Sequence, residues 1–92
     1  MTVAGFVAVR QAPETAKGFV FHTLEDRYGL INVITTPNLV QRYKQLVTEA
    51  GALIVHGHIE RQERTVNVVT ERMELLPLAG VRVPPERTHS FG

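Results

Sequence analysis

The chain has 92 residues, 43% of them hydrophobic and 21% charged, and its ten basic and nine acidic side chains give a formal net charge of +1. This length allows one domain with a modest core and excludes a two-domain enzyme with a cleft between its halves. The near balance of charge argues against a tight, stand-alone binder of single-stranded nucleic acid. No apolar run approaches the roughly 18 residues that a membrane-spanning helix needs. The absence of cysteine excludes disulfides and favours a cytoplasmic protein, and the first residues do not resemble a secretory signal.

The chain begins with a predicted strand and a turn. Residues 3–11 form a short apolar run rich in valine, which suits a buried strand better than a helix. Residues 12–16 contain a proline, which removes a backbone donor and indicates a turn. A second strand is expected over residues 18–25, where alternation puts three side chains on one face, namely Phe19, Phe21 and Thr23.

The hairpin that follows is the most informative stretch of the sequence. The second strand runs into an acidic turn over residues 25–29 that ends at a glycine, and a third strand is predicted over residues 30–35. After residue 35 the spacing of the apolar residues changes from that of a strand to that of a helix. Thr36 suits a helix cap and Pro37 the first helical position, so we expect one amphipathic helix of about three turns that ends at Gly51.

Two more strands complete the predicted domain. They cover residues 52–60 and 65–74 and are joined by the polar loop 61–64. Three strands, a helix and two strands is the order of the oligonucleotide-binding fold, or OB-fold, an all-β fold in which a helix plugs one end of a five-stranded, partly open barrel. An SH3-like barrel would not need a helix of this length, and a ferredoxin-like fold would need a second one. We expect the OB-fold domain over residues 1–76 and a loosely ordered tail over residues 77–92.

A family resemblance rests on residues spread over about four fifths of the chain. They are Val3-Ala4-Gly5, Val9-Arg10-Gln11, Pro13, Thr15-Ala16-Lys17-Gly18, Phe21, Thr23-Leu24-Glu25-Asp26, Gly29-Leu30, Asn32-Val33-Ile34, Pro37, Arg42-Tyr43, Val55 and Gly57. With these residues the chain resembles the C-terminal OB domain of bacterial C-family DNA polymerase alpha subunits, and most closely that of the error-prone branch. It is more distantly similar to the anticodon-binding OB domain of class II aminoacyl-tRNA synthetases.

The resemblance implies a binding module without catalysis. In the polymerases it implies a domain that engages the single-stranded template, while the catalytic carboxylates lie in a palm domain that this chain does not contain. In the synthetases an aromatic residue on the second strand and an amide on the third read a base, and the matching positions are Phe21 and Asn32. The sequence is compatible both with a piece of a polymerase and with a short separate open reading frame.

A face that binds single strands needs flat rings for the bases and cations for the phosphates. On an OB barrel this face lies on the second and third strands, between the loops that follow the first and the fourth strands. Phe19 and Phe21 are the candidate stacking residues, with Asn32 beside them, and the alternative is that either ring fills the core. The candidate cations lie at strand ends and in these loops: Arg10, Lys17, Arg61 and Arg64. They could equally be solvated charges paired with Glu14, Glu60 and Glu63, each pair contributing under about 1 kcal/mol.

Other groups of residues predict no chemistry. His56 and His58 share one face of a strand, but a metal site needs a third or fourth ligand and none is visible nearby, so we expect no metal or other cofactor. His56 is a candidate site residue beside the ligand groove, and the alternative is that the histidines simply fill the strand. Glu25 and Asp26 belong to a turn, and the single serine, Ser90, lies in the tail, so no activated nucleophile can be assembled. The chain is therefore not expected to be an enzyme.

The leading hypothesis is a module that binds single-stranded DNA, or RNA, with a polymerase or another replication protein as a partner and without membrane association. The rival hypothesis is a protein-interaction module that docks on a polymerase partner or pairs with itself, because the net charge is near zero and the strand edges are apolar. A third hypothesis, a tRNA anticodon binder, would prefer structured RNA loops over plain DNA.

Overall fold

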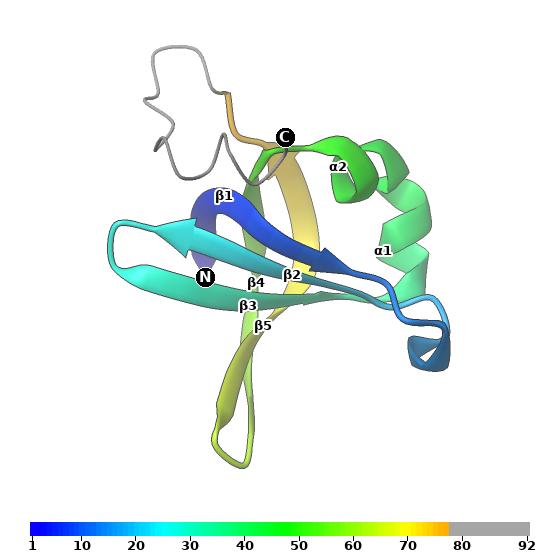
Figure 1. Ribbon diagram of the computed structural model, residues 1–92, viewed down its shortest axis with the longest axis horizontal. Helices are drawn as coiled ribbons and strands as arrows, with labels where there is room; N and C mark the ends of the chain where they lie inside the picture. The colour runs from blue at the N-terminus through cyan, green and yellow to red at the C-terminus, as the bar shows by residue number, and fades with distance from the viewer. Residues whose placement is uncertain (78–92) are drawn as a thin grey trace.

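Residues 1–77, which the computed structural model describes, form five strands, a short 3-10 helix and two α-helices (Figure 1). The elements are β1 (Thr2–Gln11), the 3-10 helix (Glu14–Ala16), β2 (Val20–Asp26), β3 (Gly29–Thr35), α1 (Pro37–Arg42), α2 (Lys44–Glu49), β4 (Ala52–Gln62) and β5 (Thr65–Leu75). This order confirms the predicted all-β OB-fold. The tail expected at 77–92 lies outside the described residues apart from Pro77. No helix within residues 1–77 is long and apolar enough to cross a membrane.

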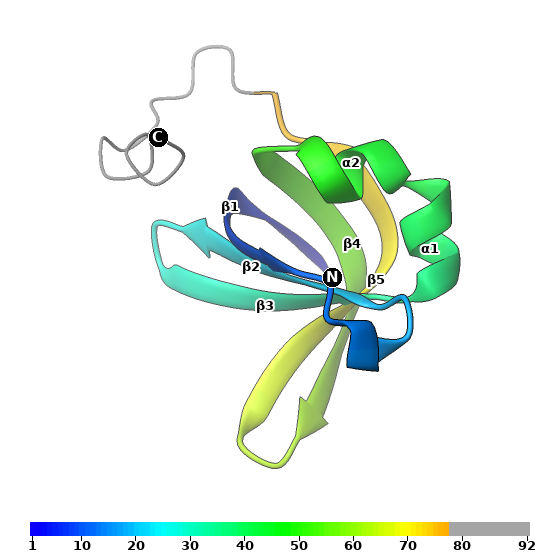
Figure 2. The same ribbon diagram turned by 45° about the vertical axis from the view of Figure 1, so that its right-hand side comes forward.

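The five strands close into a barrel in the order β1-β2-β3-β5-β4, whereas the sequence suggests a partly open one (Figure 2). The first half of β1 pairs with β4 and its second half pairs with β2. The barrel is closed by a short parallel pairing between residues 32–34 of β3 and residues 67–69 of β5. This contact joins segments that are far apart in sequence, so no local pattern indicates it.

β2 and β3 form the hairpin that the acidic turn predicts. β2 ends at Asp26 and β3 begins at Gly29, so Arg27 and Tyr28 form the loop. The backbone N–H of Tyr28 donates to Oδ1 of Asp26 at 2.7 Å, and Gly29 has a φ of 136°, a conformation that favours glycine. The aspartate side chain and the freedom of the glycine backbone thus define this turn.

The segment between β3 and β4 is two short helices and not the single helix of three turns that the apolar period predicts. Pro37 lies in the first turn of α1 as expected, but Tyr43 has φ −110° and ψ 31° and separates α1 from α2. Val40 lies before this break and Val47 after it, and both pack against the core. The break therefore lets the segment change direction while both helices stay at one end of the barrel (Figure 1).

The core is aliphatic and lies inside the barrel. Alternation in β2 buries Val20, His22 and Leu24 and leaves Phe21 and Thr23 half-buried on the outer face, which confirms the predicted faces. The other buried apolar residues come from the four other strands, from α2 and from the residue that follows it: Val7, Val33, Val47, Ala50, Ala52, Leu53, Val55, Val68 and Met73.

Three polar side chains are buried with the core. The hydroxyls of Thr35 and Thr70 bond to each other at 2.9 Å across the contact between β3 and β5. His22 donates from Nε2 to the Val47 carbonyl at 3.1 Å, while its Nδ1 is buried without a hydrogen-bond partner among the described residues. Burial lowers the pKa of His22, the bond to Val47 raises it in part, and the charge of Arg10 lowers it further. The folded domain therefore favours neutral His22.

We expect acid to destabilise the domain through His22. Above the ordinary pKa of about 6.5 the histidine is neutral in the folded and unfolded states, and its contribution to stability is complete. As the pH falls below that value, the unfolded chain takes up a proton that the folded chain resists, so the free energy of unfolding decreases until the lowered folded pKa is passed. Urea unfolding at pH 7.5 and 5.5 measures the loss. The loss should be smaller in His22→Gln, and an equal loss in both proteins would contradict the assignment.

Two glycines mark points where strands approach closely. A Cβ on Gly57 would lie 2.0 Å from the carbonyl oxygen of Val69, and a Cβ on Gly5 would lie 2.6 Å from that of Glu25. Gly57 is buried in β4 at a β-bulge, where the register with β5 shifts between His56 and Gly57. Glycine at this bulge lets β4 stay close to β5 as the two strands continue into the hairpin that projects from the barrel (Figure 1).

Candidate nucleic-acid interface

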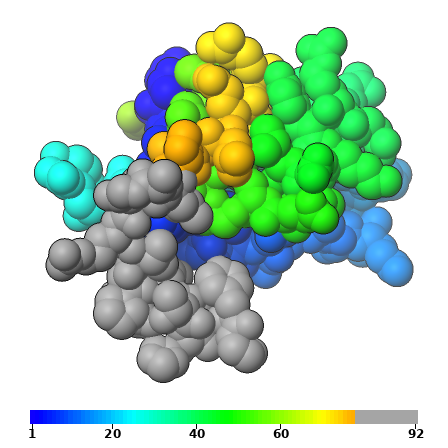
Figure 3. Space-filling model, turned by 90° about the horizontal axis from the view of Figure 1, so that it is seen from above, coloured from blue at the N-terminus to red at the C-terminus, as the bar shows by residue number. Residues whose placement is uncertain are grey.

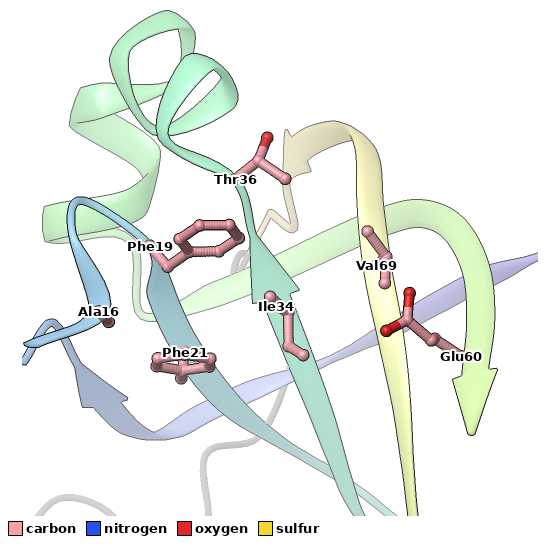
Figure 4. A pocket seen from close by; sticks show the side chains of 7 residues that line it. All are labelled: Ala16, Phe19, Phe21, Ile34, Thr36, Glu60 and Val69. Atoms are coloured by element: carbon pink, nitrogen blue, oxygen red, sulfur yellow. The ribbon is translucent and has the colours of Figure 1, made fainter. Parts of the chain in front are cut away.

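The outer face of the barrel carries a groove of about 390 Å³ beside β2 (Figure 4). Phe19 and Phe21 form one side of this aromatic groove, and Val69 of β5 and Glu60 of β4 form the other, with Ile34 of β3 between them. Ala16 and Thr36 complete the lining. Four stretches of the chain, residues 16–21, 34–36, 60 and 69, therefore contribute to one surface.

The register of the sheet explains why the apolar side chains meet. Phe21 pairs with Ile34, and Ile34 pairs with Val69, so three apolar side chains form a row across β2, β3 and β5. Phe19 and Phe21 are both half-buried and neither belongs to the buried core. Two rings at alternate positions, beside aliphatic side chains, provide the kind of surface on which bases stack.

A polar row lies next to the apolar one. Thr23 pairs with Asn32, Asn32 with Asn67, and Asn67 with Glu60, across four neighbouring strands. Of these residues the sequence predicts Asn32 as a site residue, does not predict Asn67, and suggests Glu60 only as an ion-pair partner. Asn67 and Glu60 are missed because the parallel pairing of β3 with β5, which no local pattern predicts, is what aligns them with Asn32. The row brings hydrogen-bond donors and acceptors close to the aromatic rings.

Three of the predicted cations are available to a ligand. Lys17 directly follows Ala16, which lines the groove, and it has a left-handed backbone with φ 52°. Arg61 and Arg64 belong to the β4–β5 hairpin that also carries Glu60. All three are exposed, and within residues 1–77 none of them forms an ion pair, including the pairs with acidic neighbours that the sequence allows.

Arg10, also a predicted site residue, lies outside the groove. It pairs in register with His22, whose side chain is inside the barrel, and its Nη2 donates to the carbonyl of Ala50 at 2.6 Å. Burial lowers the pKa of Arg10. The structure thus ties Arg10 to the end of α2, because its position in β1 directs it toward the helical end of the barrel.

The two histidines of β4 are bonded to separate carboxylates. His56 bonds to Glu74 at 2.5 Å and to the Thr2 hydroxyl at 2.9 Å, and His58 bonds to Glu71 at 2.6 Å. The hydrogen bond from His56 is the main cause that lowers the pKa of Glu74. Residues 1–77 contain no group of three or more potential metal ligands. His56 does not line the aromatic groove, whereas His58 continues the apolar row in register.

A second groove, of about 300 Å³, lies between the start of β3 and the β4–β5 hairpin. We call it the apolar groove, and it is lined by Met1, Val3, Leu30, Ile31, Asn32, Ile59, Val66 and Val68. Four of these apolar side chains are exposed: Met1, Leu30, Ile59 and Val66. No charged side chain lines this groove, so it suits contact with apolar protein surface better than contact with phosphates.

Comparison with known proteins agrees with the barrel fold. Residues 1–76 match the family model of the tRNA anticodon type described as an OB-fold nucleic acid binding domain. The chain is 43% identical over 77 residues to the error-prone DNA polymerase of Anaeromyxobacter dehalogenans (strain 2CP-C), an alignment that covers 84% of this chain and 7% of the polymerase. The predicted resemblance to error-prone polymerases is confirmed, and the chain spans only that small part of its relative.

Solved structures show the same fold at low sequence identity. Asparaginyl-tRNA synthetase from Pyrococcus horikoshii superimposes with a TM-score of 0.70 and 20% identity, over 94% of this chain and 23% of the synthetase chain. A chain of the S. pombe Stn1–Ten1 complex superimposes with a TM-score of 0.65 and 18% identity, over 98% of this chain and 63% of that one. At these identities the likeness establishes the fold alone.

Proposed function

Because the chain belongs to the family of OB-fold nucleic acid binding domains, we propose that it binds single-stranded DNA in the aromatic groove. The observation that carries the proposal is the pair of rings that face the groove from one side, Phe21 in β2 and Phe19 directly before β2. Alternate residues of a strand are about 6.6 Å apart, so each ring can take a different base. A stacked base contributes about 1 to 3 kcal/mol and requires no particular sequence.

Three exposed cations complete the proposed interface. Lys17 at one end of the groove and Arg61 and Arg64 on the β4–β5 hairpin attract the phosphates that connect the stacked bases. The formal net charge of +1 limits this attraction. The expected affinity is therefore modest, and stacking contributes a large share of it.

In an error-prone polymerase, this module would hold the single-stranded template and perform no chemistry of its own. The identity of 43% to such a polymerase supports this role. The groove is lined by two aromatic rings, aliphatic side chains, one hydroxyl and one carboxylate, which are groups that position a strand, and it offers no activated nucleophile. The other domains of the polymerase would then supply catalysis.

Fluorescence anisotropy with a labelled 20-base oligodeoxynucleotide tests the proposal, because this length exceeds the footprint of roughly 4 to 16 nucleotides of one OB-fold. If about three phosphates are neutralised, the affinity should fall about tenfold or somewhat more between 50 and 200 mM salt. Lys17→Glu should weaken binding and reduce the salt dependence, whereas Lys44→Glu on α2, an equal charge change, should have a small effect. No binding at high micromolar protein would refute the proposed function.

The apolar groove favours a second candidate function, which is association with another copy of the chain. Its exposed residues Leu30 and Ile59 would be covered in such a dimer. Light scattering would then give a mass that rises with concentration in the wild type and stays monomeric in Leu30→Glu. This candidate would replace the first if the mass behaves in this way and the DNA titration shows no binding.

A further inference from the structure

Glu60 is the only charged residue among the seven that line the aromatic groove. It is exposed, and its carboxylate forms no hydrogen bond or ion pair with the residues that the structure describes. Figure 4 shows it beside Val69, across Ile34 from the two phenylalanines. An unpaired carboxylate weakens the binding of a polyanion if it faces the phosphates. At this place it can favour binding only by contacting another part of the nucleotide.

A carboxylate distinguishes the parts of a nucleotide. It repels phosphates, and an ionised carboxylate only accepts hydrogen bonds. Lys17 lies on the phenylalanine side of the groove, so the phosphate of a base held in the groove is directed toward Lys17 and its edge toward Glu60, while Arg61 and Arg64 attract phosphates outside the groove. In a single strand the Watson–Crick edges of the bases are free to make such contacts.

The sheet leaves space for one base between the rings and the carboxylate. β2, β3, β5 and β4 are consecutive neighbours in the barrel, so Glu60 lies three strand intervals of about 4.8 Å each from the strand of Phe21. Both side chains line the same groove of about 390 Å³. A base stacked on a ring can therefore point its edge at Glu60, with Asn67 next to it in the polar row.

We infer that Glu60 makes the groove select bases that carry an exocyclic amino group, so that cytosine is preferred over uracil and thymine. The amino group of cytosine donates to the carboxylate, whereas uracil and thymine present a carbonyl oxygen at the same ring position and are repelled by it. This inference rests on the proposed binding of single-stranded DNA in the aromatic groove. It adds base preference to a surface whose stacking contacts accept every base.

Competition between two 20-base homopolymers, one of deoxycytidine and one of deoxyuridine, tests the inference at pH 7.5. The two probes have the same length, charge and sugar, and their pyrimidines have the same ring size and no methyl group. The wild type should bind the deoxycytidine strand about tenfold more tightly. In Glu60→Gln the ratio should fall toward one, because an amide can donate to the uracil carbonyl as well as accept from the cytosine amino group.

Glu63→Gln is the matched control, since it removes the same charge from the tip of the same hairpin and does not line the groove. It should raise the affinity for both strands slightly and leave their ratio at the wild-type value. Equal binding of both strands by the wild type, or the same change of ratio in both variants, would overturn the inference and leave the proposed function intact. If neither strand binds, the proposed function and the inference both fail.

Discussion

Replacing Gly57 with alanine should destabilise the domain by about 3 kcal/mol or more, among the larger effects of a single substitution. The new Cβ would lie 2.0 Å from the carbonyl oxygen of Val69 and 2.9 Å from its carbonyl carbon, so the backbones of β4 and β5 would have to separate. These strands form the longest pairing of the barrel, from Leu53–Leu75 to Gln62–Thr65. Urea unfolding followed by circular dichroism measures the change.

The control is Gly29→Ala. A Cβ on Gly29 would meet no atom within 4 Å, and only its φ of 136° would cause strain. This substitution should therefore cost about 1 to 3 kcal/mol, the usual range for a residue held in an unfavourable backbone region. If Gly57→Ala lowers the free energy of unfolding by no more than Gly29→Ala does, β4 and β5 do not approach each other as closely at the bulge as described.

Replacing both Phe19 and Phe21 with alanine should reduce the affinity for single-stranded DNA by at least about thirtyfold, because two stacked bases lose about 1 to 3 kcal/mol each. The rings are half-buried on the outer face and are not part of the core, so the barrel should still form. Anisotropy titration gives the affinity, and circular dichroism shows whether each variant is folded.

Tyr28→Ala is the matched control, because Tyr28 is an aromatic residue of the β2–β3 loop that is 88% exposed and does not line the groove. Its affinity should equal that of the wild type. Phe21→Leu keeps an apolar side chain and loses the flat ring, so it should retain stability and lose about tenfold in affinity, within the range for one stacked base. Wild-type affinity in the folded double variant would exclude stacking on these rings.

The parts of the fold that the sequence predicts are those that depend on near neighbours. The β2–β3 hairpin follows from Asp26, Gly29 and the alternation around them, and both faces of β2 are as predicted. The break at Tyr43 is not predicted, because it depends on how Val40 and Val47 reach the barrel end. The spacing of apolar residues indicates which side chains are buried, but it does not indicate where a helix breaks and changes direction.

The candidate site is predicted only where one hairpin builds it. Phe21 of β2 and Phe19, which directly precedes β2, are two residues apart in sequence and line the same side of the groove, and Lys17 is close to them in sequence. Glu60 and Asn67 join them through the pairings of β3 with β5 and of β5 with β4, which connect residues 35 and 7 positions apart (67 − 32 and 67 − 60). The sequence also places Arg10 and His56 at the site, but their side chains have other partners in the structure.

The short pairing of β3 with β5 is the seam that closes the barrel, with three residues from each strand. Ile34 and Val69, which lie across this seam from each other, also line the aromatic groove. A nucleotide that contacts both of them would hold β3 and β5 together, so opening of the barrel would be coupled to release of the bound DNA. Occupancy of the groove would thus stabilise the fold by an amount that rises with the logarithm of the ligand concentration, so the unliganded domain would be the less stable of the two states.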